Sequence, residues 1–422
     1  MQLQLLFPNH PNRQRAQLSM NLTTFNSFKN KNFRLFFSGQ FISLLGTWMQ
    51  KTAVSWLVYS ITQSKFMLGV SVFATLFPTA LFSLYGGIVA DRYDRYKILV
   101  ITQFVSLFQA ILMTLAVIFF KENIVWWIIS LSVMLGIING FDVPARQSLV
   151  RELIIDKADL PNALALNSSM VNLSKLIGPA IAGFVLEQFG DAICFGSNAV
   201  SFIAVLISLF LMQLPQQKIK LKADKNLKKE FTEAFLFIKN TPTISSAIIF
   251  TGLMGLFVLP FSALTPVFAK DIFKGSASTL GVVDGVIGLG AFLGALFLAS
   301  LKNGTNLSKI LAKNSFLFGI GLLLFSQTNS YPLALVFLIF GSFGMMSVRT
   351  ITNTIVQVNV HNEFRGRVIS IYLMVLTAMV PIGSLLVGSV SHYIGVQTTV
   401  LIQAILAMII SVLYIIYLRK KE

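Results

Sequence analysis

Twelve long apolar runs occupy most of the 422 residues of this chain. Each run reaches the roughly 20 residues that an α-helix needs to cross a bilayer, and none alternates polar and apolar residues as barrel strands do. With 55% hydrophobic and 12% charged residues, the chain could not cover itself with charge in water. We therefore expect an all-α membrane protein with spans near residues 36–60, 68–90, 98–120, 124–143, 163–188, 192–214, 244–269, 279–301, 308–326, 332–354, 368–390 and 396–418.

The basic residues are concentrated on one side of these predicted spans. We assign all but six of the 33 Lys and Arg to the two chain ends or to the loops that follow even-numbered spans, counting Lys309, Lys313 and Arg349 with the loops beside them. Lys51 and Lys175 fall inside spans, and the other four fall on the opposite side: Lys65, Lys121, Lys270 and Lys274. The positive-inside rule then places both termini in the cytoplasm. This placement accounts for the net charge of +17, so we expect no nucleic-acid partner.

The chain divides at a Lys-rich stretch near its middle. That stretch ends in an amphipathic segment, which predicts a cytoplasmic linker with a surface helix, or else a site that recognises lipid or a partner. The polar start of the chain predicts a tail, in which Met20 is an alternative first residue. The predicted parts are a cytoplasmic tail and interfacial lead-in (1–34), a six-helix half (35–214), the linker (215–241) and a second six-helix half (242–422).

The two halves have glycine and proline at similar positions, as expected for an internal repeat. The run Leu68-Gly69-Val70 opens the second span of the first half, and Leu280-Gly281-Val282 opens the second span of the other half. Pro179 has a counterpart in Pro381, in the fifth span of each half.

A charged hairpin joins the second and third spans. It reads Gly87-Ile88-Val89-Ala90-Asp91-Arg92-Tyr93-Asp94-Arg95-Tyr96-Lys97. This segment resembles the signature of the major facilitator superfamily, in which Gly and three residues precede Asp-Arg, and two residues later an Arg and a further basic residue follow. The resemblance implies a secondary transporter with 12 transmembrane helices in two pseudo-symmetric six-helix bundles. The corresponding turn of the second half, Leu301-Lys302-Asn303-Gly304, lacks the Asp-Arg pair.

Four further motifs narrow the resemblance to the branch that contains the enterobactin exporter. They are Gly46-Thr47-Trp48-Met49-Gln50, Asp142-Val143-Pro144-Ala145-Arg146-Gln147-Ser148, Leu160-Pro161-Asn162-Ala163 and Phe364-Arg365-Gly366-Arg367-Val368. This branch implies export of a siderophore or another amphiphilic small molecule by alternating access, driven by proton antiport and without a cofactor. A multidrug exporter and a lysophospholipid or lipid flippase are alternatives on the same fold, and an enzyme is not expected.

The expected partners follow from the same resemblance. They are a small-molecule substrate, a proton and membrane lipids, and we expect a monomer in the bacterial inner membrane. The single Cys194 cannot form an internal disulfide, and the sequence has no recognisable metal-binding cluster or nucleophile triad.

Charged residues next to the hairpin are candidates for gating. Asp91 would face the N-terminal end of the span at 368–390, just after Arg365 and Arg367, where the helix dipole and a guanidinium favour an anion. We expect this contact, supported by Arg92 and Arg95, to latch the two halves on the cytoplasmic side and to break when that side opens. The alternative is a charged loop that only sets the topology.

Small residues in the span at 163–188 predict close helix packing. Ser174, Gly178, Pro179 and Gly183 resemble the antiporter motif of exporters in this superfamily, with Ser in the first place instead of Gly. Such spacing lets helices approach closely, and the proline weakens the backbone ladder at a potential bend. The alternative is plain packing that does not set the direction of transport.

Two lysines inside the spans are the most costly residues of the chain, because a lysine in the bilayer usually needs a cavity or a partner. Lys51 lies about 22 Å along its helix at 1.5 Å per residue, and Lys175 lies nearer the midplane. We expect either an electropositive cavity for an anion, with Asp284 as gate partner or proton carrier, or one snorkelling lysine and one static ion pair. Gln50 and Asn139 could bind the same ligand, or equally other amides or water.

Energy coupling has few candidate residues in this sequence. The span at 124–143 contains no Arg of the kind that drug antiporters of the superfamily often carry there. Asp142, at the predicted end of that span, is expected to pair with Arg146 or with the hairpin.

Overall fold

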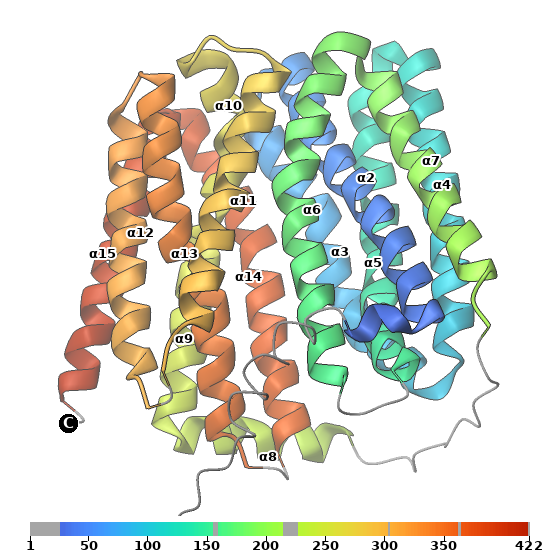
Figure 1. The fold of residues 1–422 in the computed structure, drawn as a ribbon. Coiled ribbons are helices and arrows are strands. Elements are labelled where there is room, and N and C mark those ends of the chain that lie inside the picture. Colours follow the sequence, from blue (N-terminus) through green and yellow to red (C-terminus); the bar gives the residue numbers. More distant parts are fainter. Residues whose placement is uncertain (1–25, 155–158, 214–226, 303, 362–363, 421–422) are drawn as a thin grey trace, which may run out of the picture.

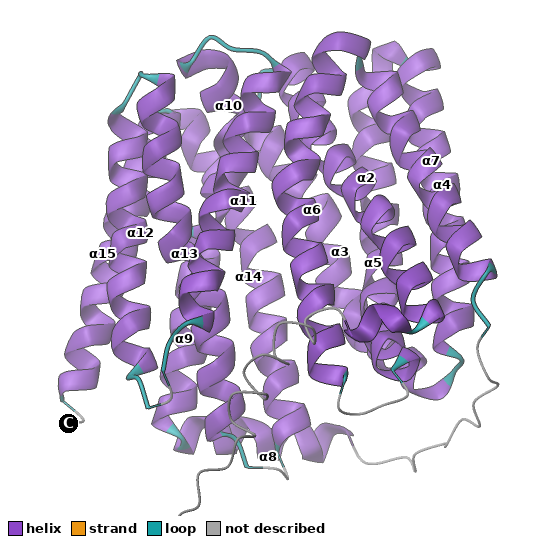
Figure 2. Ribbon diagram, in the orientation of Figure 1, coloured by secondary structure: helices purple, strands orange, loops and turns teal. Residues whose placement is uncertain are grey.

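The computed structural model describes residues 26–154, 159–213, 227–302, 304–361 and 364–420. These residues form helices joined by short loops, and the described part of the chain contains no strand (Figure 2). Eleven of its helices are long and apolar enough to cross a membrane. The helix Lys31–Thr62, which carries Lys51 and many polar residues, runs through the same bundle and is the twelfth (Figure 1).

Six long helices form the N-terminal half of the bundle (Figure 1). Local capping starts three of them, since Asn30, Ser64 and Asp94 each accept hydrogen bonds from backbone N–H groups of the first turn. The short turns η1 (Asn26–Lys29) and η2 (Lys121–Asn123) precede α2 and α5. The six helices are α2 (Lys31–Thr62), α3 (Lys65–Arg92), α4 (Arg95–Phe119), α5 (Ile124–Leu153), α6 (Leu160–Phe189) and α7 (Asp191–Phe210).

The linker helix α8 (Leu227–Asn240) precedes the C-terminal half and lies across one end of the bundle (Figure 1). The next span contains Pro260 and Pro266, and its α-helix is broken there, as expected for proline inside a helix. It runs through α9 (Pro242–Phe257), the 3₁₀ turn η3 (Leu259–Leu264), α10 (Thr265–Val267) and the π turn η4 (Phe268–Ile272). The remaining spans are α11 (Ala277–Ala299), α12 (Leu307–Gln327), α13 (Tyr331–Asn359), α14 (Arg365–Ile394) and α15 (Val396–Arg419).

The two ends of the bundle carry different elements. The helix α8, the start of α2 and the end of α15 lie at one end, here named the α8 side, and α10 lies near the other, named the α10 side (Figure 1). Of the predicted tail and linker, residues 1–25 and 214–226 lie outside the described residues. The predicted amphipathic helix is present as α8, where Ala234 and Ile238 are buried and Phe237 stacks on Phe364 at 4.8 Å between ring centroids.

Glycines make the closest contacts between the two halves. A Cβ atom on Gly183 of α6 would lie 2.7 Å from the Ala277 carbonyl oxygen and 3.0 Å from the Gly281 Cα of α11. A Cβ on Gly388 of α14 would lie 2.8 Å from the Lys65 carbonyl oxygen of α3. The fifth span of each half therefore packs against the second span of the other half, on the α10 side. Only residues without a side chain allow this approach.

Two helices extend beyond their predicted ends, and the extension of α5 changes the placement of Arg146. The apolar prediction ended one span at 143, but α5 continues to Leu153 because Leu149, Val150 and Leu153 remain buried. Asp142 and Arg146 therefore lie inside α5. Arg349 was counted among the loop residues although the predicted span at 332–354 contains it, and it lies inside α13, which continues to Asn359.

Candidate functional site

Lys51 and Lys175 come together on one aromatic ring. The Lys51 Nζ lies 4.7 Å and the Lys175 Nζ 5.8 Å from the centroid of Trp48. Trp48 can approach α6 because it lies against Gly178. A Cβ atom on Gly178 would lie only 2.6 Å from the Trp48 Cβ. The ring face carries negative charge density, so it stabilises both ammonium groups in a site that has little other compensation.

Asp284 of α11 is an acid whose charge acts on both lysines. Its Oδ1 accepts a hydrogen bond from Thr265 Oγ1 at 2.9 Å, at the start of α10. Its charge attracts both Lys51 and Lys175. The ion pairs found among the described residues involve other acids, so Asp284 forms no direct ion pair there.

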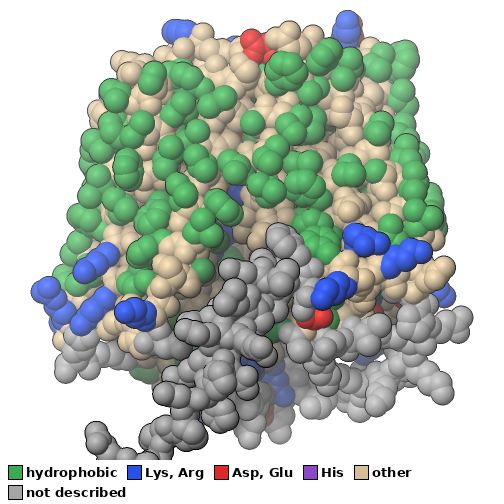
Figure 3. Space-filling model, viewed as in Figure 1, with side chains coloured by type: hydrophobic (Ala, Val, Ile, Leu, Met, Phe, Trp, Pro, Cys, Tyr) green, Lys and Arg blue, Asp and Glu red, His purple; other side chains and the backbone are tan. Residues whose placement is uncertain are grey.

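The site lies between the two halves of the bundle. Lys51 and Arg349 are exposed although both are far from helix ends, and Lys175 and Asp284 are half-buried. The charge of Arg349 on α13 repels both lysines, so the Arg349 guanidinium lies near them in the space between the halves. Figure 3 shows basic side chains deep in the crevice between the halves, below an otherwise apolar surface. Such an arrangement can hold an anion by electrostatic attraction.

Sequence reasoning missed Arg349. It lies five residues before the end of the predicted span at 332–354 but was counted with the basic residues of the loop that follows. The available signal was the continued helical spacing of Val348, Ile351, Thr352 and Ile355, which are buried on one face of α13.

The two amide candidates occupy different surroundings. Gln50 is buried within the N-terminal half, where its Nε2 donates to Gln109 Oε1 at 3.3 Å and its Oε1 accepts from Asn198 Nδ2 at 2.6 Å. The alternative in which these amides bind one another therefore holds for Gln50, and its side chain is turned away from the lysines. Asn139 of α5 is half-buried and makes no side-chain hydrogen bond among the described residues.

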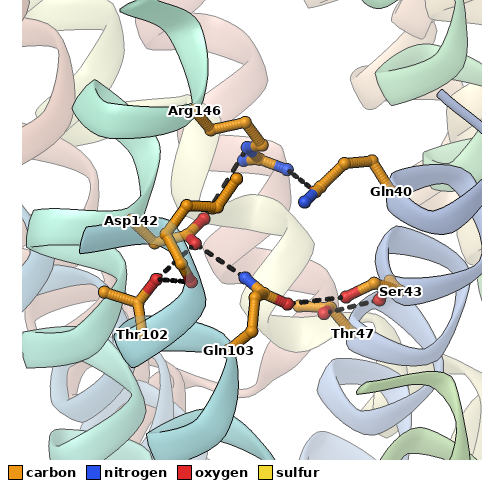
Figure 4. A network of polar contacts seen from close by, with 8 residues as sticks. Gln40, Ser43, Thr47, Thr102, Gln103, Asp142 and Arg146 are labelled. Atoms are coloured by element: carbon orange, nitrogen blue, oxygen red, sulfur yellow. Dashed lines mark hydrogen bonds and ion pairs between the residues drawn. The ribbon is translucent and has the colours of Figure 1, made fainter. Parts of the chain in front are cut away.

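Asp142 is the centre of a buried polar network in the N-terminal half (Figure 4). Its Oδ1 accepts hydrogen bonds from Thr102 Oγ1 at 2.9 Å and Gln103 Nε2 at 2.7 Å, both on α4. The predicted pairing with Arg146 is present, with 3.6 Å between Nε and Oδ2. Arg146 also donates to Gln40 Oε1 of α2 at 3.4 Å, so the network joins α2, α4 and α5.

The hairpin residues tie helices of the N-terminal half together. Arg95 pairs with Glu152 near the end of α5 and with Asp91, 3.7 Å away, and its Nε donates to the Ala90 carbonyl oxygen. The side chain of Asp91 is 66% exposed. Arg92, the remaining hairpin candidate, ends α3.

The predicted contact between Asp91 and the start of α14 is not formed in this structure. Arg365 donates to the Gln357 carbonyl oxygen at 3.4 Å, and Arg367 pairs with Glu233 of α8 at 3.4 Å. Both arginines thus have partners in the linker helix or in the C-terminal half. Because the latch is expected only in the state closed on that side, it stays a prediction.

The small residues of α6 divide between two interfaces. Ser174 and Gly178 face the N-terminal half, where Ser174 is buried and Gly178 contacts Trp48 and Leu45. The Pro179 carbonyl oxygen and Gly183 face α11. The motif therefore packs both against the same half and across the boundary between halves.

Polar contacts join the halves on the α10 side. Tyr59 of α2 donates a hydrogen bond to Asp271 of η4. The Lys270 Nζ donates to the Ser60 carbonyl oxygen at 3.4 Å, and the Lys65 Nζ donates to the Ser391 carbonyl oxygen at 3.2 Å. No group of three His, Cys, Asp or Glu suited to a metal ion occurs in the described ranges.

Comparison with known proteins places this architecture in a family. Residues 22–422 match the family of transmembrane secretion effectors. The staphyloferrin A transporter of Staphylococcus aureus is 27% identical over 392 residues, which cover 92% of this chain and 96% of the relative. The macrolide efflux protein A of Streptococcus pyogenes is 22% identical over the same 92% of this chain and 96% of its own length. The enterobactin exporter of Escherichia coli is 25% identical over 364 residues, 84% of each chain.

A solved structure shares the fold at low sequence identity. A POT family transporter in complex with 5-aminolevulinic acid superposes with a TM-score of 0.75 and 12% identity, covering 92% of this chain and 96% of the other. The resemblance expected from the hairpin is therefore confirmed, and with it a multi-pass transporter that is not an enzyme. The chain belongs to the transmembrane secretion effector family of the major facilitator superfamily.

Proposed function

We propose that this protein exports an anionic, siderophore-like small molecule across the inner membrane of a bacterium by alternating access. The observation that carries the proposal is the placement of Lys51 and Lys175 on one Trp48 ring, in a space that is open between the halves. A lysine in the bilayer is costly, and two adjacent ones are costlier because they repel each other. An anionic substrate would remove this cost each time it binds.

The family relatives support the direction and the cargo of this proposal. The names of two relatives specify transport of siderophores, staphyloferrin A and enterobactin. The basic rim on the α8 side supports a cytoplasmic location of that side and of both termini (Figure 3). Export would be driven by proton antiport, with Asp284 as the candidate carrier because it is the acid that faces both lysines.

Flux into inside-out vesicles tests this function. The experiment compares an anionic siderophore with a cationic dye, with and without a proton gradient. We expect gradient-dependent uptake of the siderophore, which Lys51→Ala/Lys175→Ala abolishes while the protein remains at its normal abundance. The matched control is Lys121→Ala/Lys302→Ala, which removes the same charge at exposed positions.

Two results would contradict the proposal. A parallel fall of flux and abundance in the Lys51→Ala/Lys175→Ala variant would make both lysines structural. Uptake of the dye alone would favour a multidrug exporter, the alternative that the macrolide efflux relative supports.

A further inference from the structure

Arg349 extends the basic site from the N-terminal half to the C-terminal half. Its side chain is exposed within the body of α13. The backbone at this position is fixed from α14, because the Tyr372 hydroxyl donates to the Arg349 carbonyl oxygen at 3.1 Å. The same hydroxyl lies 2.9 Å from Thr352 Oγ1, one turn further along α13. Arg349 therefore projects from a rigid part of the helix.

The site has a net positive charge that the described residues do not compensate. It contains three cations, Lys51, Lys175 and Arg349, and one anion, Asp284, which leaves a formal charge of +2. Asp284 is held by Thr265 and not by a direct ion pair. Trp48 stabilises the two lysines, whereas no ring contact or ion pair among the described residues involves Arg349.

The three cations differ in the anion geometry that they favour. A guanidinium presents a planar fork that binds a carboxylate or phosphate through two parallel hydrogen bonds, while an ammonium acts as a point charge. The lysines lie on α2 and α6, and the arginine lies on α13. An anion with a single charged group could satisfy one side only, and an anion with two separated groups could satisfy both.

On this basis we propose that Arg349 and the Lys51–Lys175 pair form a two-part subsite for a substrate with at least two anionic oxygen groups, one held by each half of the bundle. The proposal rests on the proposed function, since it specifies the valence of the anion that this function requires. Arg349 is then the residue that selects a polyanion over a monoanion. Carboxylates and phosphates share the required chemistry.

Binding to the purified protein in nanodiscs tests the subsite with defined probes. The probes are tricarballylate and succinate, which carry several carboxylates, acetate, which carries one, and pyrophosphate, which carries phosphates. We expect tricarballylate to bind at least tenfold more tightly than acetate, and Arg349→Gln to remove most of this preference. Arg349→Lys keeps the charge but not the fork, so it should retain part of the preference. Asp284→Asn should strengthen binding of the polyanions, because it removes the opposing charge.

The matched control is Lys302→Gln, which removes one positive charge at an exposed position and should not change binding. Correct folding of each variant is checked by size-exclusion chromatography and thermal unfolding. Stronger binding of pyrophosphate than of tricarballylate would assign the subsite to phosphates and still support two anionic groups.

Unchanged polyanion preference in folded Arg349→Gln would overturn the inference, while siderophore flux that depends on Lys51 and Lys175 would leave the proposed function intact. Absence of binding of any anion to the unaltered protein, together with absence of siderophore flux, would overturn both.

Discussion

The glycine contacts between the halves predict how the conformational equilibrium can be shifted. In Gly183→Ala, the new Cβ would lie 2.7, 2.9 and 3.0 Å from backbone atoms of Ala277, Ser278 and Gly281. Carbon atoms pack at about 3.5–4.0 Å, so α6 and α11 must separate by roughly 0.5–1 Å on the α10 side. Overpacking of this kind costs about 1–3 kcal/mol.

This cost applies only to the conformation in which α6 and α11 touch. A state that is open on the α10 side lacks the contact, so the substitution should favour that state. At 1.4 kcal/mol per factor of ten, the ratio of the two states should change about 5-fold to 150-fold. The intrinsic helix-forming advantage of Ala over Gly is the same in both states and cancels in this ratio.

Distances between spin labels measure the ratio. One pair, at Glu122 and Ser330, reports on the α10 side, and a second pair, at Arg151 and Lys302, reports on the α8 side; these four positions are exposed. Cys194 is fully buried and should not react with the label. We expect Gly183→Ala to increase the population with longer distances on the α10 side and shorter distances on the α8 side.

Two further variants make the experiment decisive. Gly388→Ala, the equivalent position on α14, should shift the distances in the same direction but less, because only one of its three nearest contacts falls below 3.0 Å. Gly196→Ala on α7 is the control, since its Cβ would have a single neighbour at 3.8 Å. An unchanged distribution in Gly183→Ala, or an equal shift in Gly196→Ala, would refute the reasoning.

Three other substitutions give independent tests. Tyr59→Phe removes the hydrogen bond to Asp271, which is worth about 1.5–3 kcal/mol for a charged acceptor; the labels on the α10 side should separate, and unchanged distances would show that the bond does not hold the halves. Asp142→Asn leaves Arg146 as an uncompensated buried charge and should lower the free energy of unfolding, measured by thermal unfolding, by about 3 kcal/mol. The control is Asp94→Asn, which keeps a good N-cap and should have little effect in the same assay. Asp91→Asn should reduce flux and the population closed on the α8 side, and a normal value of both would remove the latch.

The spans were predictable from the sequence because hydropathy is a local property. The two proline breaks and the matching glycines of the halves were also visible, since proline and glycine act on the backbone wherever they stand. The ends of α5 and α13 were not, because polar residues can continue a helix when its other face remains buried. Arg146 was misplaced for this reason, whereas Arg349 lay within the predicted span at 332–354 and was counted with the loop that follows it.

The partners of polar side chains were harder to predict than the spans. Lys51, Lys175 and Asp284 could be grouped, because a charge inside a span is rare and needs compensation. Gln50 could not be placed, since an amide on a helix gives no indication of which neighbour it faces. The contact between Tyr59 and Asp271 depends on the relative position of the halves, which no local pattern encodes.

The distribution of charges suggests how substrate binding and closure would be coupled. Arg349 repels Lys51 and Lys175 across the boundary between the halves, so bringing the halves together around an empty cavity would increase that repulsion. A polyanion held between them would replace the repulsion by attraction, and a ligand shifts an equilibrium toward the state that it binds more tightly.

Tricarballylate should therefore shorten the distance between labels at Arg151 and Lys302, and Arg349→Gln should weaken this response. Acetate at the same ionic strength is the control. It can neutralise single charges, but it cannot bridge the two halves, because bridging requires two anionic groups on one molecule. If acetate shortened the distance as much as tricarballylate, closure would depend on screening alone and the coupling argued here would be wrong.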